Sequence, residues 1–157
     1  VTYIGAEKNP LDDDKDQNTY TKVSIFLSVF DVHVNRMPVK GSISSIHYIP
    51  GKFLNANLDK SSKENERNII FVKSNNDNFY IVQIAGLIAR RIVCEVEQGQ
   101  ELKQGERIGM IRFGSRVDIY LPSGVMPQVV VGQRCIAGET VLADLSSDEV
   151  SRIGEIR

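Results

Sequence analysis

Apolar and polar residues alternate along much of the chain, a pattern typical of β-strands with one buried face. From residue 23 onward, apolar side chains recur at every second position: Val23, Ile25, Leu27 and Val29. Further strand-like runs follow at 42–49, 69–72 and 79–84. The polar sequence 74–77 between the last two runs predicts a hairpin. Few segments repeat at the helical period of about 3.6 residues, so the pattern predicts a mainly β fold with little helix.

The alternation that starts at Val23 changes character toward its end. If the strand continues without a bulge, Asp31, His33 and Asn35 follow on the same face as the apolar residues. A core-facing stripe that ends in polar side chains is unusual, so this end of the strand is a candidate site. His33 taken alone favours a structural interpretation, because a lone histidine on a strand is usually just a hydrogen-bonded side chain.

Two glycine-containing segments in the last third of the chain resemble each other. Residues 96–111 and 129–144 align without gaps, and the matched pairs include Gly99-Gln100 with Gly132-Gln133 and Gly105-Glu106 with Gly138-Glu139. The repeat predicts a sandwich or flattened barrel with pseudo-symmetric hairpins. This architecture resembles the barrel-sandwich of lipoyl and biotinyl carriers. No lysine follows Lys103 to serve as a carrier's attachment point, so a carrier function is excluded.

Composition is that of one ordinary globular domain. The chain has 157 residues, of which 41% are hydrophobic and 25% are charged, which predicts a single domain over 1–157. Its formal net charge of -1 predicts no nucleic-acid partner. The start of the sequence has no signal-peptide pattern and no initiator methionine, so we expect an N-terminally truncated domain.

Cys94 and Cys135 are the only two cysteines, and they lie far apart without a CxxC motif. This spacing argues against a metal site and against a disulfide framework. We expect both residues to be buried reduced thiols. No metal is therefore predicted.

The stretch RFGSRVD, residues 112–118, places a Gly-Ser junction between two strand-like runs. Glycine and serine are ordinary turn residues, so a plain turn is one interpretation. Ser115 used as a nucleophile with His33 is the other, and it requires the fold to bring the two side chains together. The stretch lacks the second glycine of a GxSxG elbow, which weakens a hydrolase interpretation.

Several segments in order from about Val23 to Ala143 resemble the phosphatidylserine decarboxylase family, specifically its short bacterial and archaeal type. They are FLSVFDVHVNRMPVKGSI, PGKFLNA, ENERN, VQIAGLIARRIV, GQELKQGERIGMIRFGSRVDIYLP and VGQRCIAGETVLA. The resemblance implies autocatalytic cleavage between Gly114 and Ser115, giving a β chain 1–114 and an α chain 115–157. Ser115 would become a pyruvoyl group, the electron sink for decarboxylation of phosphatidylserine to phosphatidylethanolamine, with neither pyridoxal phosphate (PLP) nor a metal.

The resemblance also assigns a role to His33 as the acid/base residue. Longer family members carry HxxHMP, whereas this chain has HVNRMP, so the first histidine is kept and Arg36 replaces the second. The family's processing triad takes an aspartate from an (S/A)PADG segment, which we expect upstream of residue 1. Asp31 is the only local substitute. Our hypothesis is that His33 serves both self-cleavage and decarboxylation.

Arginines are candidates for holding the substrate's phosphate or carboxylate, because guanidinium groups match these oxyanions. Arg112 and Arg116, which flank the junction, are the best of them, with Arg36, Arg90 and Arg91 as further candidates. Ordinary surface ion pairs are the alternative for each.

The resemblance implies partners and a location as well. We expect phosphatidylserine in a membrane as substrate, association of the two cleaved chains, and a homodimer. The enzyme is expected at the cytoplasmic face of the cell membrane, peripheral or anchored by an N-terminal region. Residues 79–89 are apolar but too short for a membrane-spanning helix, and a buried strand is the preferred interpretation.

Two other functions stay open. A serine hydrolase would use Ser115, His33 and Asp31 on an external substrate and leave the chain intact. A noncatalytic barrel-sandwich binding module would fit the repeat and would not cleave itself.

Overall fold

The computed structural model describes residues 1–12, 16–58, 60–88, 91–147, 149, 150, 152 and 154. Its strands are β1 (Tyr3–Lys8), β2 (Thr19–Leu27), β3 (Val34–Arg36), β4 (Gly41–Ile49), β5 (Arg67–Ser74), β6 (Asp77–Ile84), β7 (Ile92–Cys94), β8 (Glu101–Leu102), β9 (Arg107–Ile111) and β10 (Ser115–Leu121). The helix α1 (Ser61–Glu64) has four residues. The predicted mainly β fold with little helix is confirmed.

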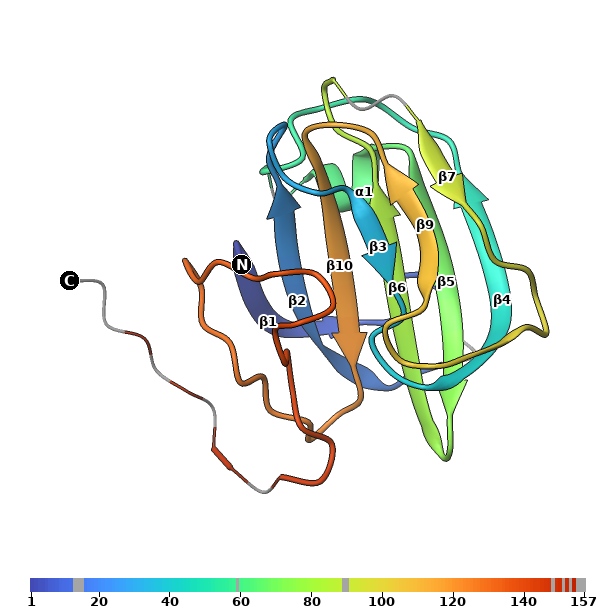
Figure 1. Cartoon of the computed structure of the whole chain (residues 1–157), viewed down its shortest axis with the longest axis vertical. Coiled ribbons are helices and arrows are strands. Elements are labelled where there is room, and N and C mark those ends of the chain that lie inside the picture. Colours follow the sequence, from blue (N-terminus) through green and yellow to red (C-terminus); the bar gives the residue numbers. More distant parts are fainter. Residues whose placement is uncertain are drawn as a thin grey trace.

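The strands form two antiparallel sheets (Figure 1). Seven strands make the larger sheet in the order β1-β2-β10-β6-β5-β4-β8, and β3-β9-β7 make the smaller one. The predicted hairpin is present, because β5 and β6 pair from Arg67↔Ile84 to Ser74↔Asp77. Asn75 provides the left-handed residue of its turn, with φ of 52°.

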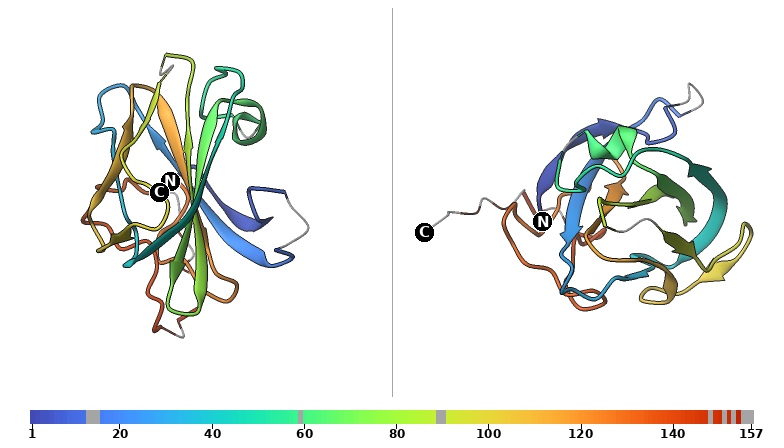
Figure 2. Two further views of the ribbon diagram at one scale, coloured as in Figure 1. Left: turned by 90° about the vertical axis from the view of Figure 1, so that its right-hand side faces the viewer. Right: turned by 90° about the horizontal axis from the view of Figure 1, so that it is seen from above.

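The smaller sheet lies in front of the larger one in Figure 1, and the turned view in Figure 2 shows them as two layers. One hydrophobic core cluster joins residues of the larger sheet, such as Val23 and Ile119, to Ile108 and Ile111 of β9. Burial of this apolar surface between the sheets is the main force that holds the sandwich together. The architecture agrees with the predicted sandwich and positions β10 in the middle of the larger sheet.

A second cluster lies on strands of the same large sheet and is rich in tyrosine. It contains Tyr20, Tyr80 and Tyr120, with Ile69, Val82 and Ile84. The cross-strand partner of Tyr120 is Tyr80, whereas Ile119 of the first cluster is opposite Ile81. Because adjacent strand residues point to opposite faces, the larger sheet is buried on both faces here.

The predicted repeat is present in its turns. Gly99 and Gly132 have φ of 86° and 89°, and Gly105 and Gly138 have φ of 85° and 82°. Gly99 and Gln100 exchange backbone hydrogen bonds with Ile43. Gly132 and Gln133 do the same with Val1. The two segments therefore share turn geometry and a mode of pairing.

The two repeat segments differ in how far their backbones pair with other strands. Residues 96–111 contribute β8 and β9, whereas 129–144, all of them described, form only an isolated bridge from Ala143 to Pro127. The first segment pairs with β3, β4 and β7. The backbone of the second meets a distant segment at Val1, so its turns are formed without a continuing ladder.

Candidate functional site

The Gly114–Ser115 junction lies in the connection between β9 and β10 and has a left-handed backbone. Phe113 has φ of 38° and Gly114 has φ of 67°. Glycine adopts this region freely, but phenylalanine does so at a cost of about 1–3 kcal/mol. The two residues before Ser115 therefore both have left-handed backbones, and that of Phe113 is strained.

Ser115 is the first residue of β10 and has no solvent exposure (0%). Its backbone is opposite Leu27 in β2, and β6 pairs with β10 from Arg116 onward. The serine is thus held by the centre of the larger sheet, while the residues before it belong to a loop.

His33 meets Ser115 although 82 residues separate them in sequence. The imidazole Nδ1 lies 3.2 Å from Ser115 Oγ, and Nε2 lies 2.8 Å from the carbonyl oxygen of Ser28. A carbonyl can only accept, so a neutral His33 carries its proton on Nε2 and leaves Nδ1 free to accept from the serine hydroxyl. The two residues singled out in the sequence are therefore together, in the orientation that a general base needs.

The loop that carries His33 interrupts the predicted long strand. β2 ends at Leu27 and β3 begins at Val34, so Val29 is exposed instead of facing the core. The strand prediction for this stretch was wrong because backbone hydrogen bonding turns the chain here: the Asp31 N–H donates to the Ser28 carbonyl at 3.0 Å. His33 and Asn35 are nevertheless both buried.

Asp31 holds this loop and does not bond to the imidazole. Its Oδ2 accepts from the Ser28 N–H at 2.8 Å, and its Oδ1 lies 3.2 Å from Arg134. The pKa of the Asp31 carboxyl is lowered, chiefly by the Ser28 N–H. Asp31 thereby fixes Ser28, whose carbonyl orients His33.

Gly86 is a site residue that the sequence reasoning missed. It follows β6, and a methyl group built on it would overlap the carbonyl oxygen of Gly114. Glycine at this position therefore lets the carbonyl of the junction approach. The only signal in the sequence is a glycine immediately after an apolar strand, which is common.

A buried polar chain also links the two sheets. Gln83 Nε2 donates to Asn35 Oδ1 at 2.9 Å, and Asn68 Nδ2 donates to Gln83 Oε1 at 3.0 Å. Asn35 is two residues after His33, so these bonds anchor β3 to the larger sheet close to the site.

The candidate arginines are dispersed. Arg112 is exposed in the junction loop, and Arg36 is exposed with its guanidinium bonded to the Gly105 carbonyl at 2.9 Å. Arg91 is exposed, and its carbonyl accepts from the Arg112 N–H at 3.3 Å. Arg90 lies outside the described residues. Of these, Arg112 lies in the junction loop, and Arg91 is joined to it by this backbone hydrogen bond.

Arg116 is next to Ser115 but belongs to the other face of β10. Its Nε lies 2.8 Å from Asp118 Oδ1, and its Nη1 donates to the carbonyls of Ala56 and Leu58 at 3.2 Å. Alternation along the strand points its side chain away from that of Ser115. The structure therefore does not bring the Arg116 guanidinium to the serine.

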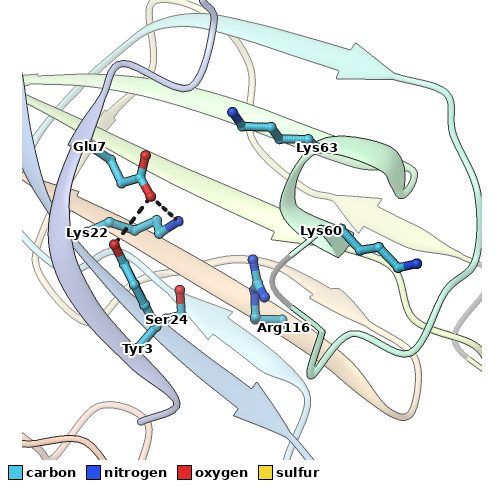
Figure 3. Close-up of a pocket in the computed structure, with 7 residues that line it drawn as sticks. All are labelled: Tyr3, Glu7, Lys22, Ser24, Lys60, Lys63 and Arg116. Atoms are coloured by element: carbon cyan, nitrogen blue, oxygen red, sulfur yellow. Dashed lines mark hydrogen bonds and ion pairs between the residues drawn. The ribbon is translucent and has the colours of Figure 1, made fainter.

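A cavity of about 310 Å³ lies on the Arg116 side of the sheet (Figure 3). Its lining residues are Tyr3, Glu7, Lys22, Ser24, Lys60, Lys63 and Arg116. Lys22 is already paired with Glu7 at 3.2 Å. Neither His33 nor Ser115 lines this cavity, so it is separate from the candidate site.

Cys94 and Cys135 form no disulfide and are free thiols. Both are half-buried, so the expectation that they are fully buried was wrong. Burial raises the pKa of the Cys135 thiol. Among the described residues, His, Cys, Asp and Glu side chains form no group of three or more that could hold a metal ion.

Comparison with known proteins identifies the family. The family model for phosphatidylserine decarboxylase matches residues 3–143, which include His33 and Ser115. The chain belongs to the phosphatidylserine decarboxylase family. The resemblance noted in the sequence is thereby confirmed.

Two relatives of this decarboxylase family are similar over most of the chain. The "Phosphatidylserine decarboxylase proenzyme" of Cereibacter sphaeroides is 56% identical over 138 residues, covering 87% of this chain and 60% of that protein. The protein of the same name from Beijerinckia indica subsp. indica is 58% identical over 128 residues, covering 82% of this chain and 55% of its own length. The chain thus spans somewhat more than half the length of these relatives.

Proposed function

We propose that this chain is the catalytic part of a pyruvoyl-dependent phosphatidylserine decarboxylase that cuts its own Gly114–Ser115 bond. The observation that carries the proposal is the contact between Ser115 Oγ and Nδ1 of His33, at a buried junction with a strained backbone. Membership of the decarboxylase family and the word "proenzyme" in the names of the relatives support it.

In the first step, His33 Nδ1 takes the proton of Ser115 Oγ, and the oxygen attacks the carbonyl carbon of Gly114. The imidazolium returns this proton to the Ser115 nitrogen as the peptide C–N bond breaks, and an ester then joins Gly114 to the serine side chain, which leaves a free amine. The Ser28 carbonyl keeps the imidazole in the required tautomer and stabilises the proton on Nε2 when the ring becomes charged.

In the second step, a base removes the α-proton of Ser115, and the Gly114 carboxylate leaves from its β-carbon. The remaining enamine consumes one water and releases ammonia, so the new chain starts with a pyruvoyl group. When formed, that group supplies an electron sink for decarboxylation. Ser115, its precursor, is held next to His33, which can donate or accept a proton there.

Finer features of the proposal concern the substrate and location. Arg112 is the arginine nearest the junction in sequence whose exposure leaves it accessible to a phosphate or carboxylate. We extend the proposal to phosphatidylserine in the cytoplasmic face of a membrane, to the two cleaved chains remaining together, and to a homodimer.

A hydrolase acting on an external ester is less well supported. Ser115 has no exposed surface and begins a central strand, whereas a hydrolase presents its nucleophile to incoming substrate. The buried hydroxyl is better suited to attack the adjacent peptide bond of its own chain.

Intact-mass spectrometry with N-terminal sequencing of the full-length protein tests the proposal. We expect two pieces that separate after Gly114, the second with an N-terminus blocked to Edman degradation. Ser115→Ala removes the attacking oxygen and should leave an uncut chain. Conversion of phosphatidylserine to phosphatidylethanolamine should accompany cutting. An uncut wild-type protein with an unmodified Ser115 contradicts the proposal.

A further inference from the structure

Exposed apolar side chains gather on three loops around the Gly114–Ser115 junction. One loop connects β2 to β3, one follows β6, and one connects β9 to β10. Phe30 is 95% exposed. We call the following set the apolar loop surface: Val29, Phe30, Val32, Leu87, Ile88 and Phe113.

Contacts between the loops show that this surface is continuous. The ring of Phe113 lies 5.6 Å from that of His33, and a Cβ built on Gly114 would lie 3.7 Å from Val29 Cγ1. Gly86 packs against the Gly114 carbonyl, which joins the loop after β6 to the junction. In Figure 1, β2 and β6 end and β10 begins at the same upper end of the molecule.

The charges of these loops are mainly basic. Arg91 and Arg112 are exposed, and Asp31, the one acidic residue in the described parts of the three loops, is paired with Arg134. Separate apolar loop tips flanked by cations suit a lipid surface, because the tips can enter the acyl region while the cations meet anionic headgroups. Soluble proteins rarely expose such a patch without a binding function.

We propose that the apolar loop surface docks on an anionic lipid bilayer and places the Ser115 end of β10 at the membrane. The proposal rests on the proposed function, since a phospholipid substrate must reach a buried residue at this end of the sheet. In the described part of the chain, no helix is long and apolar enough to cross a membrane.

A tryptophan reporter tests the contact at one residue. The sequence contains no tryptophan, so Phe30→Trp introduces a single probe, and Val141→Trp gives a matched probe at an exposed position in the segment after β10. Vesicles of phosphatidylcholine with phosphatidylserine should shift the emission of Phe30→Trp to the blue, and brominated acyl chains should quench it. Val141→Trp should change little. Equal responses from the two probes, or none from Phe30→Trp, overturn the proposal.

Phe30→Asp tests the energetic contribution. Placing a charge where a phenyl ring enters lipid should weaken vesicle binding about tenfold or more, whereas Val141→Asp should not. Self-cleavage and activity on short-chain phosphatidylserine dispersed as monomers should be unchanged in Phe30→Asp. Wild-type affinity for vesicles in Phe30→Asp overturns the docking surface.

The same variant separates failure of docking from failure of the proposed function. An uncut protein whose vesicle binding still depends on Phe30 would contradict the proposed function and retain the docking surface. A protein that cuts itself and acts on monomeric lipid but does not bind vesicles would support the proposed function and contradict the docking surface. If Phe30→Asp instead converts a dimer to a monomer in size-exclusion chromatography without changing vesicle binding, the surface is an interface between copies.

Discussion

Both faces of strand β10 are buried, and each contains polar groups, but these groups have different kinds of partner. Val117, Ile119 and Leu121 face the apolar core between the sheets, and that face ends in Ser115. The other face carries Arg116, Asp118 and Tyr120. Its polar groups are bonded to one another within the strand, whereas the Ser115 hydroxyl lies at the edge of an apolar core and contacts His33 from another segment.

The difference lies in the partner of each group. Arg116 and Asp118 neutralise each other at 2.8 Å, which leaves neither free for proton transfer. Ser115 faces His33, whose imidazole can accept a proton and donate it back. Neighbouring residues of one strand thus differ in chemistry because one has a partner that can accept its proton and the other has a fixed counter-ion.

Apart from loss of the serine itself, the largest effect on reactivity is expected from His33→Gln. Glutamine keeps hydrogen bonding but cannot act as a base, so the rate of self-cleavage should fall about 10²–10⁴-fold. Appearance of the cut chains over time, followed by mass spectrometry, measures this rate. His47→Gln is the control, because His47 is exposed and its ring contacts Ser45 at 3.0 Å. Normal cutting by His33→Gln would exclude His33 as the base.

Asp118→Asn tests the opposite face. The substitution leaves a buried Arg116 without its counter-ion, so the free energy of unfolding should fall by about 3–5 kcal/mol. Urea denaturation of the uncut Ser115→Ala background measures it without interference from cleavage. Glu64→Gln removes an exposed pair with Lys52 and should change nothing measurable. If Asp118→Asn stops cutting while the fold keeps its stability, the two faces are not separate in function.

Gly86→Ala is expected to slow cutting by about 100-fold, since its methyl group would displace the Gly114 carbonyl. Gly5→Ala is a matched change, because the three atoms nearest to the methyl group there belong to the Tyr3 side chain, which can move. The rate of cutting and the far-ultraviolet circular dichroism should be measured together. A well-folded Gly86→Ala protein that cuts at the normal rate would show that this close approach has no role.

The smallest effect concerns the acid stability contributed by the tyrosine cluster. Burial raises the pKa of Asp16, but hydrogen bonds from Tyr20, Asn18 and Tyr80 outweigh it, and the net pKa is below 3.8. This contribution is present above the unfolded pKa and is lost as the pH falls through the lower folded pKa. Tyr20→Phe should therefore cost about 1 kcal/mol at neutral pH, with the difference from wild type narrowing below pH 3.8.

Urea denaturation over a pH series measures this difference, with Tyr120→Phe as the control. In the described structure the Tyr120 hydroxyl has no hydrogen bond to Asp16, whereas the Tyr20 and Tyr80 hydroxyls both donate to it. A constant difference between Tyr20→Phe and wild type at every pH would contradict the assigned cause.

The sequence predicted local elements of secondary structure better than it predicted close contacts between distant segments. The β5–β6 hairpin follows from strong turn residues between two apolar runs, and Ser115 with His33 followed from family resemblance. The break at 28–33 was missed because Val29 continues the alternation, while the turn depends on bonds between Asp31 and Ser28. The role of Gly86 depends on a segment almost thirty residues away, which periodicity does not report.

The position of β10 also bears on what happens to a chain that has been cut before Ser115. The new N-terminus would begin strand β10, which is hydrogen-bonded to β2 on one side and to β6 on the other. Such a nicked protein would hold its two polypeptides together without any covalent link, and they would part only on denaturation. After the cut, the strained left-handed backbone at Phe113 and Gly114 could relax and move the two new chain ends apart. This relaxation would oppose re-formation of the peptide bond.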